Sequence, residues 1–261
     1  MDVIRSSQNA IFKSLRRLIE HGRERRAQRT IVLEGVHLVQ SLQRSGGEIL
    51  QYIVREDKAD DAEILHWTQG RHQLFSHARL ADLSALDNPP TLLALARLPT
   101  PSTQASKHAI LLDRIQDPGN LGTLLRSAAA AGIAQVQLGP GCTDAWSLRC
   151  LRAGMGAHFQ LALHSRSDLS ATAADGGRQL AVTCLENAQS LYQADLSTPT
   201  LWVFGNEGEG VNHELLARAD LRLRIDMAAS MESLNVAAAA TVCLFEQRRQ
   251  EELLSRAAVK D

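Results

Sequence analysis

Short apolar runs alternate with amphipathic segments along the first part of the chain. The runs IVLEG, ILQYIVRE and TLLALAR suit strands, whereas VHLVQSLQRSGG and the stretch near Asp60–Gln69 have helical spacing. Strands that alternate with helices are typical of an α/β domain. The pattern therefore predicts a first α/β domain over residues 1–98.

A polar stretch without periodicity, LPTPSTQASK at Leu98–Lys107, follows that domain. Its Pro, Ser and Thr residues are typical of a linker, which we place at residues 99–107. Beyond it, apolar runs typical of buried strands are HAILLD, AQVQLG, QLAVTC, LWVFG and LRLRID. Helical patterns occupy TLLRSAAAAG, a stretch near Ser147–Ala153 and a long one from about Leu234 to Ser255. This order predicts a mainly parallel sheet covered on both faces, in a second domain over residues 108–261.

Composition excludes several classes of protein. A chain of 261 residues with 44% hydrophobic and 22% charged residues suits two globular domains. The longest apolar stretch, Val236–Phe245, is far shorter than the roughly 20 residues that span a bilayer. The start of the chain has no signal-peptide pattern, so we expect a cytoplasmic protein without a membrane partner. The four cysteines and nine histidines show no metal-ligand spacing, and no metal is expected.

The net charge of −1 conceals a basic segment at the N-terminus. Residues 1–29 carry eight basic and three acidic side chains, a local net charge of +5. Such a segment suits contacts with phosphates. A solvated amphipathic helix with a basic side is an equally good interpretation of the charge pattern alone.

The loops after the strands of the second domain are the expected place for chemistry, because ligands of parallel sheets bind at the carboxyl ends of strands. The loop after HAILLD puts Asn120 at a helix N-terminus and Arg126 about two turns further along. The other residues of that helix are mostly apolar, so Arg126 needs an acidic partner such as Glu207, or an anionic ligand such as phosphate. The alternative is an arginine that reaches solvent from the flank of the helix.

Two more loops carry polar groups at unusual positions. FGNEGEG at Phe204–Gly210 is acidic and lacks the glycine spacing of phosphate-binding fingerprints. It suits a ligand with a positive centre or with hydroxyl and amine groups; the alternative is a tight turn followed by a helix cap. In the loop Ile225–Val236, Ser233 is a candidate N-cap of the last helix. Asn235, in the first turn of an Ala-rich helix, indicates a side chain used for hydrogen bonding.

Together these loops resemble the SpoU (TrmH) family of RNA ribose 2′-O-methyltransferases. The shared motifs are N-x-G-x-x-x-R from Asn120 to Arg126, FGNEGEG, and S-L-N-V at Ser233–Val236, in the family's order. LRAGMGAHF at Leu151–Phe159 is similar to the family segment between the first two motifs. The resemblance covers about residues 110–250 and, more loosely, residues 7–97, where EGVHLVQSL is similar to the start of the family's substrate-binding domain. In the third motif Asp226 stands where the family usually has Pro, and Ala237 where it often has Ser.

The resemblance implies a SPOUT-type catalytic domain whose parallel sheet contains a deep trefoil knot, beside a smaller ribosomal-protein-like α/β domain that binds RNA. It also implies S-adenosylmethionine as the cofactor and a homodimer formed through the catalytic domain. The implied reaction transfers a methyl group to a ribose 2′-hydroxyl without a metal. An RNA-binding domain of this kind favours 23S ribosomal RNA. A tRNA methyltransferase, a non-catalytic RNA-binding assembly factor and an unrelated α/β enzyme stay open as alternatives.

The resemblance also assigns roles to individual residues. Arg126 is the implied central catalytic residue, positioned by Asn120 and Glu207, while Ser233 and Asn235 hold ribose, phosphate or cofactor. The residues implied to surround the cofactor are Leu138, Gly139, Phe204, Gly205, Asn206, Gly208, Ile225, Met227, Leu234 and Asn235. The residues implied to contact RNA phosphates are Lys13, Arg16, Arg17, Arg23, Arg25, Arg26 and Arg29.

Overall fold

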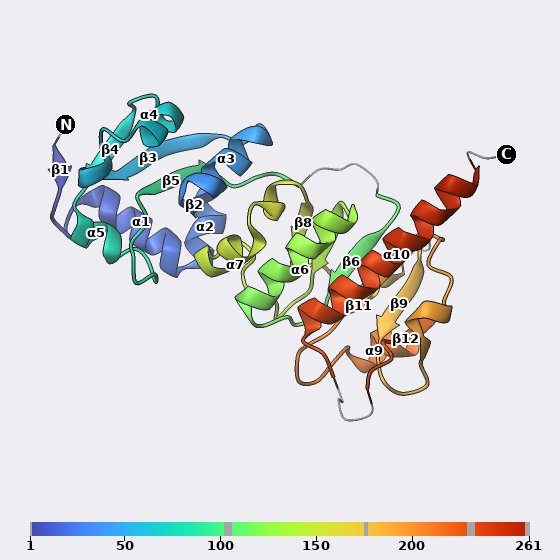
Figure 1. The fold of residues 1–261 in the computed structure, drawn as a ribbon. Helices are drawn as coiled ribbons and strands as arrows, with labels where there is room; N and C mark the ends of the chain where they lie inside the picture. The colour runs from blue at the N-terminus through green and yellow to red at the C-terminus, as the bar shows by residue number, and fades with distance from the viewer. Residues whose placement is uncertain (1, 102–105, 175–176, 229–232, 259–261) are drawn as a thin grey trace. The chain divides into compact units, whose positions relative to one another are not determined.

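A computed structural model describes residues 2–101, 106–174, 177–228 and 233–258 (Figure 1). The chain forms two compact units, one of residues 1–100 with 146–159 and one of residues 101–145 with 160–261. Residues 102–105 of the expected linker lie outside the described residues. The expected domains, 1–98 and 108–261, differ from this division in the segment 146–159, which packs with the first unit.

The first unit contains a mixed five-stranded sheet in the order β1-β4-β3-β5-β2. Its strands are β1 Val3–Ile4, β2 Thr30–Glu34, β3 Ile49–Arg55, β4 His72–Phe75 and β5 Leu92–Arg97. β5 runs antiparallel to β2 and β3, whereas β1, β4 and β3 are parallel. The sequence pattern predicted β2, β3 and β5 but not β1 or β4, which are too short to show a period.

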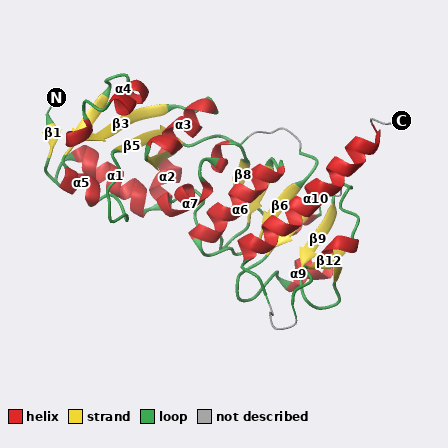
Figure 2. Cartoon of the chain, in the orientation of Figure 1, coloured by secondary structure: helices red, strands yellow, loops and turns green. Residues whose placement is uncertain are grey.

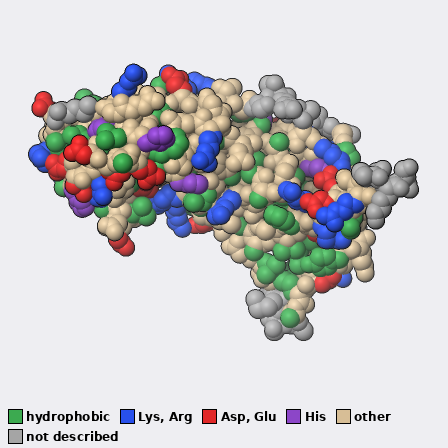
Figure 3. Space-filling view, turned by 45° about the horizontal axis from the view of Figure 1, so that its top comes forward, with side chains coloured by type: hydrophobic (Ala, Val, Ile, Leu, Met, Phe, Trp, Pro, Cys, Tyr) green, Lys and Arg blue, Asp and Glu red, His purple; other side chains and the backbone are tan. Residues whose placement is uncertain are grey.

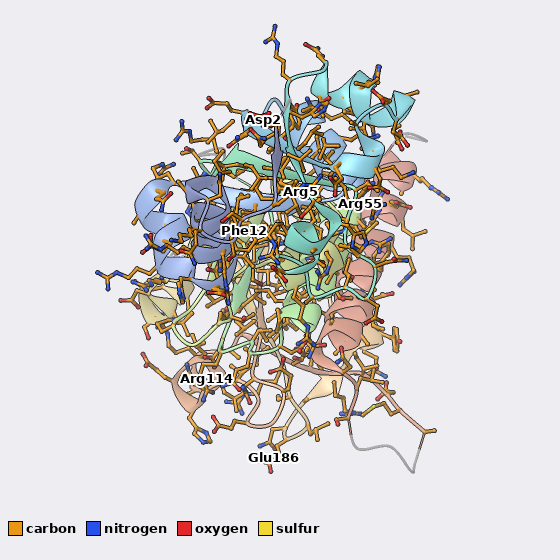
Figure 4. All side chains as sticks on the ribbon, turned by 90° about the vertical axis from the view of Figure 1, so that its left-hand side faces the viewer. Asp2, Arg5, Phe12, Arg55, Arg114 and Glu186 are labelled. Atoms are coloured by element: carbon orange, nitrogen blue, oxygen red, sulfur yellow. The ribbon has the colours of Figure 1, made fainter. Side chains whose placement is uncertain are left out.

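Helices pack an apolar core against this sheet. The helical elements are α1 Ala10–Glu20, α2 Gly22–Gln28, α3 Val36–Arg44, η1 Glu56–Lys58, α4 Ala62–Thr68, α5 His77–Ala81, α7 Leu148–Gly154 and η2 Ala157–Phe159. Phe12, Leu15 and Leu18 of α1 are buried with Ile53 and Phe75 of the sheet. Phe12, labelled in Figure 4, lies with its ring centroid 6.5 Å from that of Phe75. The helical spacing of these α1 residues explains why one face of a strongly basic segment is buried.

Residues of α7 explain why the segment 146–159 belongs to the first unit. Leu148 packs against the core cluster of that unit. Arg152 donates to the buried carboxylate of Glu34 at 2.5 Å, and the hydroxyl of Ser84 donates to the other oxygen of that carboxylate at 2.5 Å. Since a buried charge without a partner is strongly unfavourable, this ion pair fixes α7 to β2.

The second unit contains a seven-stranded sheet in the order β10-β12-β9-β11-β6-β7-β8. Its strands are β6 Ala109–Leu112, β7 Gln135–Leu138, β8 Ala162–Ser165, β9 Gln179–Thr183, β10 Gln189–Ser190, β11 Thr200–Phe204 and β12 Leu221–Arg224. All its pairings are parallel, so the predicted parallel sheet is confirmed. The short strands β8 and β10 were not predicted.

Helices cover both faces of this sheet, as Figure 2 shows. They are α6 Pro118–Ala131, α8 Leu169–Ala173, α9 His213–Ala217 and α10 Val236–Ala258, with the short η3 Leu191–Gln193. Leu201 and Val203 of β11 share a core cluster with residues of α8 and α9. The alternate residue Trp202 points to the other face, where its indole nitrogen donates to Gln247 of α10 at 2.8 Å. α6 and α10 lie side by side on that face (Figure 1).

Within the described ranges, no helix is long and apolar enough to cross a membrane. The same residues contain no cluster of three or more His, Cys, Asp or Glu side chains that could hold a metal ion.

Candidate active site

The loop after β6 places Asn120 and Arg126 on α6, as the sequence predicted. Asp117 caps this helix, because its carboxylate accepts from the backbone nitrogen of Asn120 at 2.8 Å. Pro118 occupies the start of the helix, where its missing N–H has no cost. Asn120 therefore lies in the first turn of α6, and Arg126 lies exposed further along it.

Asn120 joins two residues that are far away in the sequence. Its amide nitrogen donates to Glu207 Oε1 at 3.0 Å, and its carbonyl oxygen accepts from the amide of Asn235 at 2.8 Å. The backbone nitrogens of Gln116 and Asp117 also donate to the Glu207 carboxylate, each at 3.5 Å. The structure thus brings together Asn120, Glu207 and Asn235, three of the five predicted catalytic residues.

These hydrogen bonds set the charge state of Glu207. Desolvation alone would raise the pKa of this carboxyl group. The hydrogen bonds from Asn120 and from backbone N–H groups outweigh that effect, so the pKa of Glu207 lies below its ordinary value. Glu207 is consequently an ionised carboxylate at neutral pH.

Asn235 is the N-cap of α10. Its side-chain oxygen accepts from the backbone nitrogens of Ala237 at 2.9 Å and Ala238 at 3.3 Å. The interpretation of Ser233 as the cap is therefore wrong; Ser233 lies exposed before the helix, which begins at Val236. Residues 229–232 of the same loop lie outside the described residues. One asparagine both caps α10 and orients Asn120.

Arg126 makes no hydrogen bond or ion pair with any described residue, and neither Asn120 nor Glu207 contacts its guanidinium. An exposed guanidinium without an acidic partner nearby is able to bind an anionic group such as a phosphate.

The turn that carries Glu207 is held by its own backbone and by Asn206. Asn206 and Gly210 exchange two backbone hydrogen bonds, at 3.0 and 2.9 Å. The side chain of Asn206 accepts from the nitrogens of Gly208 and Glu209 and donates to the carbonyl of Arg114 at 3.0 Å. A Cβ atom at Gly205 would lie 2.2 Å from the carbonyl carbon of Gly210, so only glycine fits there. FGNEGEG is thus a tight turn that presents the ionised Glu207, so the two interpretations of this loop do not exclude each other.

Arg114, labelled in Figure 4, links this turn to the loop after β6. Its guanidinium donates to Asp113 at 3.0 and 3.3 Å, to Glu209, and to the carbonyl of Gly210 at 3.4 Å. Hydrogen bonds and charge attraction from Asp113 and Glu209 raise the pKa of Arg114 further above its already high value. The backbone of Arg114 is left-handed, with φ of 57°, which is unfavourable for a side chain of this kind. No sequence motif indicated Arg114, whose one signal is its place after a buried strand.

The remaining predicted cofactor residues follow carboxyl ends of strands. Leu138 ends β7 and Gly139 follows it, Phe204 ends β11, and Ile225 and Met227 follow β12. Because β6, β7, β11 and β12 are parallel, these positions share one edge of the sheet. Leu234, before α10, is 42% exposed.

The unusual Asp226 is held from the edge of the same sheet. The hydroxyl of Ser190 in β10 donates to its carboxylate, and Arg224 Nε donates to the other oxygen at 3.2 Å. Asp226 therefore forms part of a hydrogen-bonded anchor for the loop that contains Ile225 and Met227.

The structure separates the predicted RNA-contacting residues into different groups. Arg25 is 4% exposed, and its guanidinium donates to the carbonyls of Leu18 and, at 2.9 Å, Ile19. Its prediction as a phosphate contact is wrong, because its side chain satisfies the end of α1. Arg16 pairs with Glu20 at 2.8 Å, and Arg29 donates to Thr100 at 3.0 Å. The exposed members of the set are Lys13, Arg16, Arg17, Arg23, Arg26 and Arg29.

Comparison with known proteins agrees with this fold. Residues 107–245 match the SpoU rRNA Methylase family, and residues 9–94 match the MRM3-like substrate binding domain. The chain belongs to the SpoU rRNA methylase family, and the predicted resemblance is confirmed.

Relatives and solved structures of this family match nearly the whole chain. The chain is 30% identical to the 23S rRNA (guanosine(2553)-2′-O)-methyltransferase RlmP of Bacillus subtilis (strain 168), over 95% of this chain and 100% of the relative. A crystal structure of an RNA 2′-O ribose methyltransferase has a TM-score of 0.80 at 30% identity, covering 94% of this chain and 97% of the other. The AdoMet-bound rRNA methyltransferase from Sinorhizobium meliloti has a TM-score of 0.80 at 28% identity, covering 95% and 97% of the two chains.

Proposed function

We propose that this protein transfers a methyl group from S-adenosylmethionine to a ribose 2′-hydroxyl of RNA, with 23S ribosomal RNA as the substrate. The observation that carries the proposal is the network in which Asn120 joins Glu207 and Asn235 at the carboxyl edge of a parallel sheet. The family and the relatives named as rRNA 2′-O-methyltransferases support the substrate class.

The residues at this edge fit S-adenosylmethionine by their chemistry. Glu207 supplies an ionised carboxylate beside the loops that follow the strands of the second sheet. A negative charge there suits a ligand with a positive centre. Backbone groups of Leu138, Ile225, Met227 and Leu234 lie at the same edge for the adenosine and methionine parts of the cofactor. When bound, S-adenosylmethionine supplies an activated methyl group, so no metal is needed for the transfer.

The protein's own groups position the substrate hydroxyl and assist removal of its proton. Arg126 is permanently charged and hence a poor base. Its guanidinium, which has no partner among the described residues, instead binds an RNA phosphate and stabilises the negative charge that develops on the 2′-oxygen, while the phosphate takes the proton. Asn120 and Asn235 hold the start of α6 and of α10 in place, and Ser233 lies exposed beside them for ribose or phosphate.

Three further properties of the family belong to the proposal. By its membership of the family, we expect the catalytic domain to contain the trefoil knot. The protein forms a homodimer through this domain, since Phe245, Leu253 and Leu254 of α10 are 44%, 52% and 56% exposed. Figure 3 shows apolar surface of this kind on the second unit. The protein acts in the cytoplasm, where its proposed ribosomal substrate is.

Transfer of labelled methyl from S-adenosylmethionine to unmodified total RNA tests the proposal. The expected result is 2′-O-methylribose in the large ribosomal RNA with the wild type and none with Arg126→Ala. Label in tRNA would support the methyl transfer but show that the substrate is tRNA and not ribosomal RNA. A relative from Synechocystis, 33% identical, is named an uncharacterized tRNA/rRNA methyltransferase. Cofactor binding without transfer to any RNA would favour an assembly factor.

A further inference from the structure

The first unit contains a hollow of about 530 Å³ away from the basic segment. It lies where α3 and α4 end and where β3 and β4 begin. Two aromatic side chains, Tyr52 and Trp67, line it together with the glutamines Gln43, Gln51, Gln69 and Gln73. Arg71 is the only Lys or Arg among the described residues of its lining.

One polar atom at this hollow lacks a partner. The amide nitrogen of Gln43 donates to the Tyr52 hydroxyl at 3.0 Å. The carbonyl oxygen of Gln43 is buried and accepts no hydrogen bond within the described part of the chain. A buried acceptor without a donor costs about 1–3 kcal/mol, so a ligand that donates a hydrogen bond favours a turn of the Gln43 amide toward the hollow. Desolvation raises the pKa of Tyr52. Its hydroxyl is therefore protonated at neutral pH and is able to donate a hydrogen bond to a ligand.

The lining matches an uncharged aromatic ligand better than a phosphate. The carboxyl ends of two helices, α3 and α4, carry partial negative charge and disfavour an anion. Aromatic rings and amide groups are the groups that stack on unpaired bases and hydrogen-bond to their edges. The whole hollow lies within residues 9–94, which match a substrate-binding domain.

We propose that this hollow binds one unpaired nucleobase of the RNA substrate, stacked on Trp67, with Gln43 and Tyr52 at its polar edge. The proposal rests on the proposed function, because it takes the substrate to be RNA. Exposed residues of the basic segment, such as Lys13 and Arg17, then hold phosphates, while the hollow holds a base.

Tryptophan fluorescence tests the stacking directly. Of the three tryptophans, Trp202 and Trp146 are buried, at 0% and 9% exposed, whereas Trp67 lies half-buried in the lining. Single-stranded decamers of adenosine and of uridine are the probes, and the duplex of the two decamers is the control. We expect at least one single strand to quench the wild-type emission and the duplex to leave it unchanged. Trp67→Ala and Trp67→Phe remove that quenching.

Binding of unmodified 23S rRNA transcript tests the contribution to affinity. Trp67→Ala is expected to weaken binding about tenfold and Trp67→Phe, which keeps an aromatic ring, much less. The dependence of binding on salt stays the same in both, since no phosphate contact is lost. Arg71→Ala leaves Tyr52 and Trp67 intact. It gives a second measurement of transcript binding at the hollow if Trp67→Ala unfolds. Tyr192→Ala, which removes a 55% exposed aromatic side chain in the second unit, is the matched control.

The outcomes separate this proposal from the proposed function. If the wild type methylates RNA but Trp67→Ala keeps wild-type affinity and KM for the transcript, the hollow is not a base site and only this proposal fails. Quenching that persists in Trp67→Ala has the same meaning. If the wild type transfers methyl to no RNA, the proposed function itself fails, whatever the Trp67 variants bind.

Discussion

The polar side chains at the carboxyl edge of the second sheet converge, whereas those of the two N-terminal helices diverge. Asn120 meets Glu207 and Asn235 across 87 and 115 residues of sequence. In α1 and α2, by contrast, Arg25 is buried while its neighbour Arg26 is exposed. Parallel strands bring their ends to one edge, so distant residues meet there. A helix instead distributes adjacent residues around its axis, and a high local charge does not define one binding surface.

The largest expected effect is that of Arg126→Ala, at the edge where polar groups converge. Arg126 is the charged side chain of α6, and it has no partner among the described residues. Its loss should lower kcat about 100- to 1000-fold. Binding of S-adenosylmethionine, measured by calorimetry, should remain, because no residue of the Asn120 network is removed. A variant that loses cofactor binding together with activity would show that Arg126 supports the fold of the site instead.

Asn120→Ala removes the side chain that connects the three polar residues of the site. It removes the hydrogen bonds to Glu207 and Asn235, and we expect kcat/KM to fall about 10- to 100-fold. Thr123→Ala, an exposed position on the same helix, is the matched control and should behave as the wild type. Steady-state methyl transfer distinguishes the two, and equal behaviour of both variants would remove Asn120 from the site.

Arg114 tests whether the link between two loops matters to cofactor binding. Arg114→Ala loses the bonds to Asp113, Glu209 and Gly210, so KM for S-adenosylmethionine should rise about tenfold, with a smaller change in kcat. Arg114→Gly loses the same bonds but relieves the left-handed backbone. It should therefore melt at a higher temperature than Arg114→Ala and bind cofactor no better. Wild-type KM in the glycine variant would contradict a positioning role for the side chain.

The basic segment should separate into structural and RNA-contacting residues. Arg25→Ala leaves the carbonyls of Leu18 and Ile19 without their donor and should lower the free energy of unfolding by about 1–3 kcal/mol. Arg17→Ala and Arg23→Ala, at exposed positions, should leave the melting temperature unchanged. Each should weaken RNA binding severalfold and reduce its dependence on salt concentration. Thermal melts check the predicted loss of stability, and RNA binding at several salt concentrations checks the predicted loss of affinity. If Arg25→Ala kept full stability but bound RNA more weakly, Arg25 would be an RNA-contacting residue and not a structural one.

The smallest effect concerns pH. Because the pKa of Glu207 is lowered, its carboxylate is still mostly ionised at the pH where an ordinary glutamate is half protonated. Any stabilisation from its hydrogen bonds is thus present above that pH and is lost only as the pH falls through the lower native pKa. Cofactor affinity should stay constant between about pH 7 and 5 in the wild type. In Asn120→Ala, where desolvation remains without its main opposing bond, affinity should start to fall at a higher pH. Identical pH profiles would contradict the assigned cause.

Sequence alone was sufficient for the parallel sheet, the family and the positions of Asn120 and Arg126. Runs of buried residues and motif spacing carry this information locally, because a strand and the loop after it are adjacent in the chain. Sequence alone was insufficient for β4 and β8, which are short. It was also insufficient for the first residue of α10, because Ser233 and Asn235 are both good N-cap residues. Local propensity does not distinguish two acceptable caps that lie two residues apart.

Tertiary structure alone decided which polar groups meet. The burial of Arg25, the pairing of Arg152 with Glu34 and the role of Arg114 depend on residues that no local pattern connects. Sequence spacing names the groups able to form such bonds, but a hydrogen bond or an ion pair requires two atoms within about 3 Å of each other. Only the packing of strands and helices from separate parts of the chain sets those distances.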